Sequence, residues 1–142
     1  MFNHILYATD GSDHSRKAVA YVNEVARLTN AKVTVLHAYH PLSDLEYLLS
    51  GAEYDRAFHH RVKGAGQIIE EAASALTAEG IEIEQDLAVG PPAEAILRAA
   101  DARKCDLIIM GARGLSDLQG LLLGSVSHKV IHHAECPVMI VR

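Results

Sequence analysis

A glycine-rich segment near the carboxyl end of the chain has the residue types of an anion-binding loop. Gly111, Gly114 and Gly124 punctuate it, Ser125 follows the last of them, and the apolar run 107–110 before it is typical of a buried strand. Apolar residues then recur at helical spacing. Glycine lets the backbone approach a ligand and allows positive φ, and free N–H groups at a helix start attract phosphate. This order of strand, loop and helix predicts a phosphate site.

The loop differs from two common phosphate-binding motifs. A Walker A loop ends in Gly-Lys followed by Ser or Thr, and no lysine lies between Gly111 and Ser125. A dinucleotide fingerprint follows a first strand, whereas Gly64-Ala65-Gly66 lies inside a helical pattern. The segment is therefore interpreted as a phosphate loop of another kind.

Strand-like and helix-like segments alternate along the chain, which predicts a parallel sheet with helices on both faces. Ser12 or Asp13 is expected to cap the first helix, Asn30 to end it and Pro92 to open the third. Strict polar alternation in 81–84 places the third strand near an edge. The expected strands cover residues 5–9, 32–39, 81–89, 107–110 and 137–141. The first expected helix ends at residue 30, the second covers 54–80, the third begins at residue 92 and the fourth covers 126–133. Segment 41–51 is interpreted as either a loop or a short helix.

The spacing G-x2-G-x9-G-S from Gly111 resembles the nucleotide-binding signature of the universal stress protein family. The resemblance covers nearly the whole chain and includes Asp10-Gly11-Ser12, the turn Val89-Gly90-Pro91 and the ending 133–138, where Glu135 replaces a common proline. It implies an α/β fold with one doubly wound, five-stranded parallel sheet of order 3-2-1-4-5 and helices on both faces. One domain spanning residues 1–142 is expected.

That strand order reverses between strands 1 and 4, and ligands of such sheets bind outside the carboxyl ends at the reversal. Asp10 ends the first strand and the glycine-rich loop follows the fourth, so we expect both in one crevice. The Asp10 carboxylate can accept hydrogen bonds from a ribose or a base amine, or help to hold a metal. Its alternative role is to fix the turn with Gly11. By resemblance, Asp10 corresponds to a nucleotide-contacting aspartate.

The backbone of the loop is assigned to the phosphates. The N–H groups of Gly111 and Gly114 are expected on one side, with Gly124, Ser125 and Val126 on the far side. Ser125 can also cap the helix that follows.

Two further side chains are candidates for the same site. Ser127 is expected to help hold phosphate or a Mg²⁺-bound water. The Arg113 guanidinium suits phosphate, with solvent exposure or an ion pair in a dimer as alternatives.

The chain has nine histidines, and His128, His132, His133 and Cys136 together suggest a metal site. Structural zinc prefers tighter paired spacings, and in the family a histidine shortly before Cys-Pro is ordinary. No metal ligand is therefore assigned to a side chain, and Mg²⁺ is expected only through the phosphates. Cys105 and Cys136 are interpreted as core or near-core thiols.

Charge and hydropathy exclude several classes of protein. The 142 residues carry a formal net charge of −5 with both signs interspersed, which argues against nucleic acid binding. No apolar stretch reaches membrane-spanning length and no signal peptide precedes the first strand, so we expect a cytoplasmic protein without membrane insertion.

The sequence supports binding more strongly than catalysis. It shows no Ser-His-Asp order, no cysteine nucleophile within a motif and no loop lysine, whereas phosphoryl transfer needs a positioned base and cationic clamps. The resemblance implies binding of ATP or another adenine nucleotide, with Mg²⁺, as a switch or sensor in stress adaptation. Two alternatives stay open: a slow ATPase or fold-related nucleotide-transferring enzyme, and a scaffold that binds no nucleotide.

The last strand predicts self-association. The run from Pro137 to Val141 shows no polar alternation, and the resemblance makes it an outer strand. An uncovered apolar edge exposes unpaired backbone groups and invites aggregation. We therefore expect a homodimer in which this strand pairs antiparallel with its copy about a two-fold axis, as is common in the family.

Overall fold

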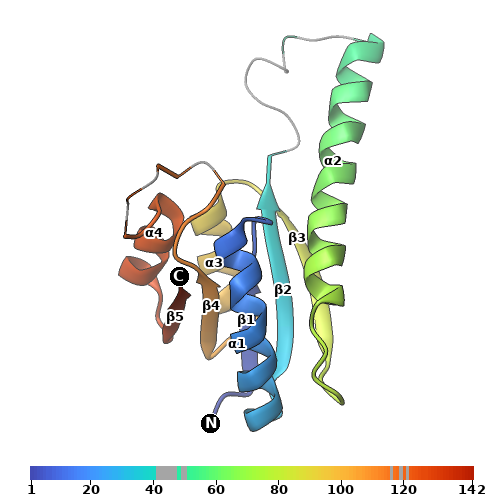
Figure 1. Cartoon of the computed structure of the whole chain (residues 1–142). Coiled ribbons are helices and arrows are strands. Elements are labelled where there is room, and N and C mark those ends of the chain that lie inside the picture. The colour runs from blue at the N-terminus through green and yellow to red at the C-terminus, as the bar shows by residue number, and fades with distance from the viewer. Residues whose placement is uncertain (41–47, 49–50, 116, 119, 121) are drawn as a thin grey trace.

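Strands and helices alternate along the chain in the computed structural model, which describes residues 1–40, 48, 51–115, 117–118, 120 and 122–142 (Figure 1). The strands are β1 (His4–Ala8), β2 (Lys32–Tyr39), β3 (Ile83–Val89), β4 (Leu107–Gly111) and β5 (Val138–Val141). The helices are α1 (Asp13–Thr29), α2 (Gly51–Ser74), α3 (Pro92–Ala102) and α4 (Ser125–His133). Apart from residues 48 and 51, the segment 41–51 lies outside the described residues.

The five strands form one parallel sheet in the order β3-β2-β1-β4-β5. β1 lies at the centre, where Leu6 is paired with Thr34 of β2 and with Ile108 of β4. The predicted fold class and strand order are confirmed. The order reverses between β1 and β4, so the carboxyl ends of these strands border the crevice that a doubly wound sheet offers to ligands.

Alternate residues of the central strands supply two separate cores. Ile5 and Tyr7 of β1 pack with α1 and α2, whereas Leu6 and Ala8 pack with α3 and α4. All four side chains are buried because helices cover both faces of the sheet. None of the described helices has the length and apolar character needed to cross a membrane.

The ends of the helices agree with the predictions in part. Ser12 caps α1, its Oγ accepting a hydrogen bond from the N–H of Ser15 at 3.3 Å, and Asn30 ends the helix in the left-handed region at φ 56°. Gly124, in extended backbone, is the N-cap of α4 and makes no side-chain cap bond. Ser125 is therefore the first helical residue, and the prediction that it caps this helix is wrong.

The first half of α2 is more exposed than its apolar spacing predicts. Ala65, Ile69 and Ala72 are buried against the sheet, but Phe58 is 37% exposed and stacks instead on Tyr54 of its own helix. Figure 1 shows the reason: this half of α2 extends beyond the end of the sheet. The periodicity identified the apolar face correctly, but no sheet lies opposite the first turns.

At the opposite end of the sheet from the crevice, a buried histidine joins three elements. His4 Nε2 lies 2.8 Å from Thr34 Oγ1, and Nδ1 lies 3.1 Å from the carbonyl oxygen of Arg103. Burial lowers the pKa of His4 below its ordinary value of 6.5, and the positive charge of Lys32 lowers it further. The neutral imidazole is therefore the form that the folded protein favours.

We expect His4 to make the protein less stable in mild acid. The unfolded chain takes up the proton first, because the pKa of His4 is lower in the folded state. The stability that neutral His4 contributes is fully present above about pH 6.5 and is lost as pH falls toward the folded-state pKa of His4. Urea unfolding at about pH 7.5 and about pH 5.5 checks this, with His4→Gln as the comparison. The wild type should lose more stability between the two pH values than the variant; equal losses would contradict the assignment.

Candidate functional site

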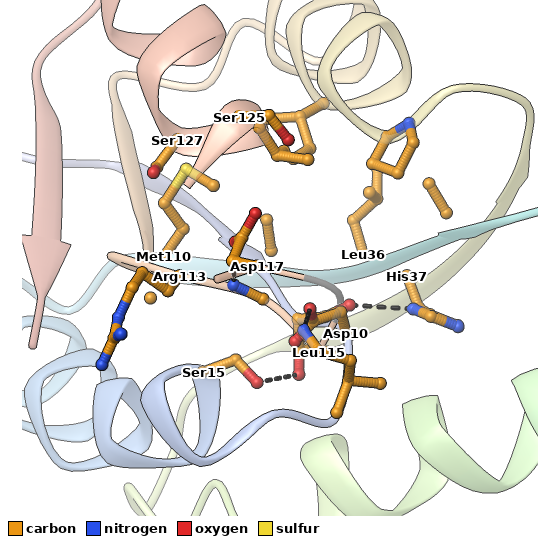
Figure 2. A pocket seen from close by; sticks show the side chains of 18 of the residues that line it. Asp10, Ser15, Leu36, His37, Met110, Arg113, Leu115, Asp117, Ser125 and Ser127 are labelled. Carbon is orange, nitrogen blue, oxygen red and sulfur yellow. Dashed lines mark hydrogen bonds between the residues drawn. The ribbon is translucent and has the colours of Figure 1, made fainter. Parts of the chain in front are cut away.

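A cavity of about 290 Å³ opens at the carboxyl ends of β1, β2 and β4, where the strand order reverses (Figure 2). It is lined by Ala8, Thr9, Asp10, Ser15, Leu36, His37, Ala38, Ile68, Pro92, Ile96, Met110, Gly111, Arg113, Gly114, Leu115, Asp117, Ser125, Val126 and Ser127. All the residues assigned to the site from the sequence are among them except Gly124, which lies at the start of α4.

Much of the cavity lining is apolar. It includes Leu36 of β2, Ile68 of α2, Ile96 of α3, Met110 of β4 and Val126 of α4. Polar side chains come from the end of β1, from the loop after β4 and from the start of α4 (Figure 2). A cavity with a largely apolar lining and a few convergent polar groups suits a small organic ligand that has a polar end.

Gly114 and Gly124 leave room for carboxylate oxygen atoms. A Cβ added to Gly114 would come closer than 3.0 Å to Asp10 Oδ2, and one added to Gly124 would come closer still to Asp117 Oδ2. Neither glycine has a positive φ. Of the two uses of glycine expected in this loop, close approach to the backbone is therefore the one seen at Gly114 and Gly124, and positive φ is not.

Gly111 is required for a different reason. A Cβ at this position would lie 2.7 Å from the carbonyl carbon of His14 and 2.7 Å from the nitrogen of Ser15. The first turn of α1 thus packs directly on the end of β4. This contact brings the loops after β1 and β4 together, and the assignment of the Gly111 N–H to a phosphate stays a prediction.

Asp10 ties the two loops to each other. Its Oδ1 accepts a hydrogen bond from the N–H of Ser12 at 2.9 Å, and its Oδ2 accepts one from the N–H of Leu115 at 3.0 Å. The first bond is the turn contact considered as the alternative role of this residue. The structure thus favours a positioning role for Asp10, and contact with a nucleotide stays a prediction.

The start of α4 presents backbone donors beside the cavity. The N–H of His128 makes the first bond of the helix, to the Gly124 carbonyl at 3.0 Å. The N–H groups of Ser125, Val126 and Ser127 therefore have no partner within the helix. Such groups carry the positive end of the helix dipole and favour an anion.

The Ser127 hydroxyl is committed to the loop itself. It is 2% exposed and donates to the carbonyl of Ala112 at 2.6 Å, and the N–H of Gly124 donates to the same carbonyl at 2.7 Å. A hydroxyl has a single proton, so in this arrangement it has none to offer to a phosphate. Ser127 therefore fixes how α4 meets the loop, which differs from the role predicted for its side chain.

The family model for the Universal stress protein family matches residues 1–142. The chain belongs to this family. A universal stress protein of Thermus aquaticus is 42% identical over 143 residues and covers 100% of both chains. A crystal structure of a universal stress protein in complex with cAMP is 32% identical, with a TM-score of 0.74 over 99% of this chain and 97% of that one. The universal stress protein of Archaeoglobus fulgidus in complex with dAMP is 25% identical, with a TM-score of 0.71 over 100% and 98%.

In this universal stress protein, Arg113 lies at the edge of the site. Its Nη2 is 3.2 Å from Nε2 of His14, on the first turn of α1. The side chain also lines the cavity, so it is neither a free surface group nor committed to an ion pair within the described part of the chain.

Several residues of the cavity were not singled out from the sequence. His37 Nδ1 lies 2.9 Å from the carbonyl oxygen of Thr9, and the Thr9 hydroxyl donates to Ser15 Oγ at 3.1 Å. His37 could have been found, because it lies near the end of the strand that neighbours β1 at the crevice. Asp117 could have been found as an acidic residue inside the glycine-rich loop.

The histidines and cysteines of this family member do not form a metal centre among the described residues, where no three His, Cys, Asp or Glu side chains gather. His128 and His132 stack on each other on α4, with ring centroids 5.5 Å apart. Cys105 is buried and Cys136 half-buried, as predicted for near-core thiols. Burial raises the pKa of Cys105 to about 11, so this thiol is a weak nucleophile.

Proposed function

We propose that this universal stress protein binds an adenine nucleotide, ATP with Mg²⁺, in the cavity beside β1 and β4, and acts in the cytoplasm as a switch or sensor of stress. The observation that supports this most is the close approach of carboxylate oxygens to Gly114 and Gly124. A site that accepts one kind of anionic oxygen against its backbone suits another, the phosphate oxygen. The cAMP and dAMP held by two relatives favour adenine as the base.

The parts of the cavity match the parts of such a ligand. The apolar side chains of the lining suit a purine ring, and the N–H groups at the start of α4 suit phosphate oxygens. Arg113 is the only Lys or Arg among the described residues that line the cavity, whereas Asp10 and Asp117 both carry negative charge there. Mg²⁺ on the phosphates would offset part of that charge, since it prefers phosphate and carboxylate oxygens.

A thermal-shift titration with ATP and Mg²⁺ tests the proposal. A ligand that binds only the folded state raises the melting temperature in a saturable way. A time course for ADP in the same samples separates a binding protein from a slow ATPase. The absence of a shift with any adenine nucleotide would favour the scaffold that binds none.

We also propose that the protein is a homodimer through β5. The strand lies at the edge of the sheet, and the carbonyls of Pro137 and Val141 accept hydrogen bonds from the β4 side at 3.0 and 2.7 Å. Because backbone groups alternate along a strand, those of Val138 and Ile140 point to the free edge. That edge is apolar and offers a second copy both hydrogen bonds and hydrophobic contact.

Ile140→Pro is expected to convert the dimer into a monomer. Proline removes an edge N–H that β4 does not use, and edge strands tolerate proline. Deleting Met139–Arg142 is a harsher test, because it also removes the Val141 carbonyl that holds the residue after β4. Light scattering should give a dimeric mass for the wild type and for Ile140→Val, and a monomeric mass for Ile140→Pro. A dimeric Ile140→Pro variant would place the interface elsewhere.

A further inference from the structure

Asp117 lies inside the glycine-rich loop, with its carboxylate against both Gly114 and Gly124, the residue before α4. Its Oδ2 accepts a hydrogen bond from the N–H of Gly114 at 2.5 Å, and its own N–H donates to the Gly114 carbonyl at 3.4 Å. A Cβ on Gly124 would come closer than 3.0 Å to both Oδ2 and Cγ of this carboxylate. Figure 2 shows Asp117 between Ser125 on one side and Asp10 on the other.

This carboxylate uses a donor that a phosphate would need. The Gly114 N–H is one of the backbone groups assigned to phosphate, and the space beside Gly124 is where the start of α4 faces the cavity. We call the space bounded by Gly114 and Gly124 the anion position. A carboxylate and a phosphate group cannot both occupy it, because both are anionic and both need the same N–H.

We propose that Asp117 determines the phosphate selectivity of the cavity, because its carboxylate fills the anion position and a phosphate group must displace it. This inference rests on the proposed nucleotide function and specifies how that site treats its ligands. A nucleoside without phosphate leaves Asp117 in place. Each ligand that reaches the anion position with negative charge has to break the bond to Gly114 first.

The charge around the anion position strengthens this discrimination. The Oδ2 atoms of Asp10 and Asp117 both lie within 4 Å of the point where a Cβ on Gly114 would stand, so two carboxylates crowd the same backbone. The guanidinium of Arg113 is directed to His14, 3.2 Å from its Nε2. The repulsion that a phosphate meets therefore grows with its charge and falls when Mg²⁺ neutralises it.

Calorimetric titration of the 142-residue chain with adenosine, AMP and ATP tests the proposal. Asp117→Asn removes the charge of the side chain, and Asp117→Ala removes the whole carboxylate from the anion position. Asp101→Asn, which removes one exposed charge from α3, is the matched control. For Asp117→Ala we expect ATP affinity to rise about tenfold, equivalent to about 1.4 kcal/mol, in EDTA and less in Mg²⁺. Adenosine affinity should stay within about twofold, about 0.4 kcal/mol.

The ligand-free protein offers an independent readout. In an NMR spectrum, the Gly114 amide proton should move upfield in Asp117→Ala, since it loses a charge-assisted hydrogen bond. An unmoved resonance would overturn the contact on which the proposal depends.

The outcomes distinguish a failure of the Asp117 proposal from a failure of the proposed nucleotide binding. Wild-type binding of ATP with equal or weaker binding by both Asp117 variants would overturn the role of Asp117 and leave the nucleotide function standing. An equal gain in Asp101→Asn would also overturn it, because net charge would then be the cause. If no variant bound any of the three ligands, the nucleotide function and the selectivity would both be overturned.

Discussion

Replacing Gly114 by valine is expected to lower ATP affinity at least tenfold, about 1.4 kcal/mol, with the fold retained. The new Cβ would come closer than 3.0 Å to Asp10 Oδ2 and would lie beside Asp117. The branched side chain would push the Asp10 carboxylate aside and crowd the anion position beside the Gly114 N–H. Titration calorimetry measures the affinity, and circular dichroism checks the fold.

The matched control for this prediction is Gly66→Val. It makes the same substitution in α2 at a glycine where an added Cβ meets nothing within 4 Å. Its ATP affinity should equal that of the wild type. Undiminished ATP binding by Gly114→Val would show that the loop backbone is not where the phosphates lie.

Gly111→Val is expected to lower the stability of the fold, in contrast to Gly114→Val, which is expected to lower ATP affinity. The Cβ would lie 2.7 Å from backbone atoms of His14 and Ser15, and backbone cannot swing aside as a side chain can. The first turn of α1 would have to move off β4. Overpacking of this kind costs about 1–3 kcal/mol of unfolding free energy. Urea unfolding of this variant and of Gly66→Val measures the loss, and a change below about 0.5 kcal/mol would refute the close contact.

The fold could be predicted further than the site. The alternation of apolar runs and helical stripes predicts the order of the elements, and the family resemblance supplies the strand order that the periodicity does not contain. The exposure of Phe58 could not be predicted, because a periodic stripe shows which face of α2 is apolar but not where the sheet beside it ends.

At the site, the glycines show what the sequence alone could not predict. The spacing of Gly111, Gly114 and Gly124 marks the loop correctly, yet it does not reveal why each glycine is there. Gly111 makes room for the backbone of α1. Gly114 makes room for the carboxylate of Asp10, which is distant in sequence, and Gly124 for that of Asp117 in the same loop. Those causes are tertiary contacts. For the same reason Asp117 looks like an ordinary polar loop residue until its carboxylate is seen against Gly114.

The most direct test of a nucleotide site at this crevice is an NMR titration of the wild-type protein with ATP and Mg²⁺, observed through the backbone amides. We predict saturable shifts of the amides of Gly114, Leu115, Ser125 and Val126, with small changes at the far end of the sheet around His4. Shifts that do not saturate, or that gather instead around another cavity, lined by residues that include Cys105 and Cys136, would contradict the account.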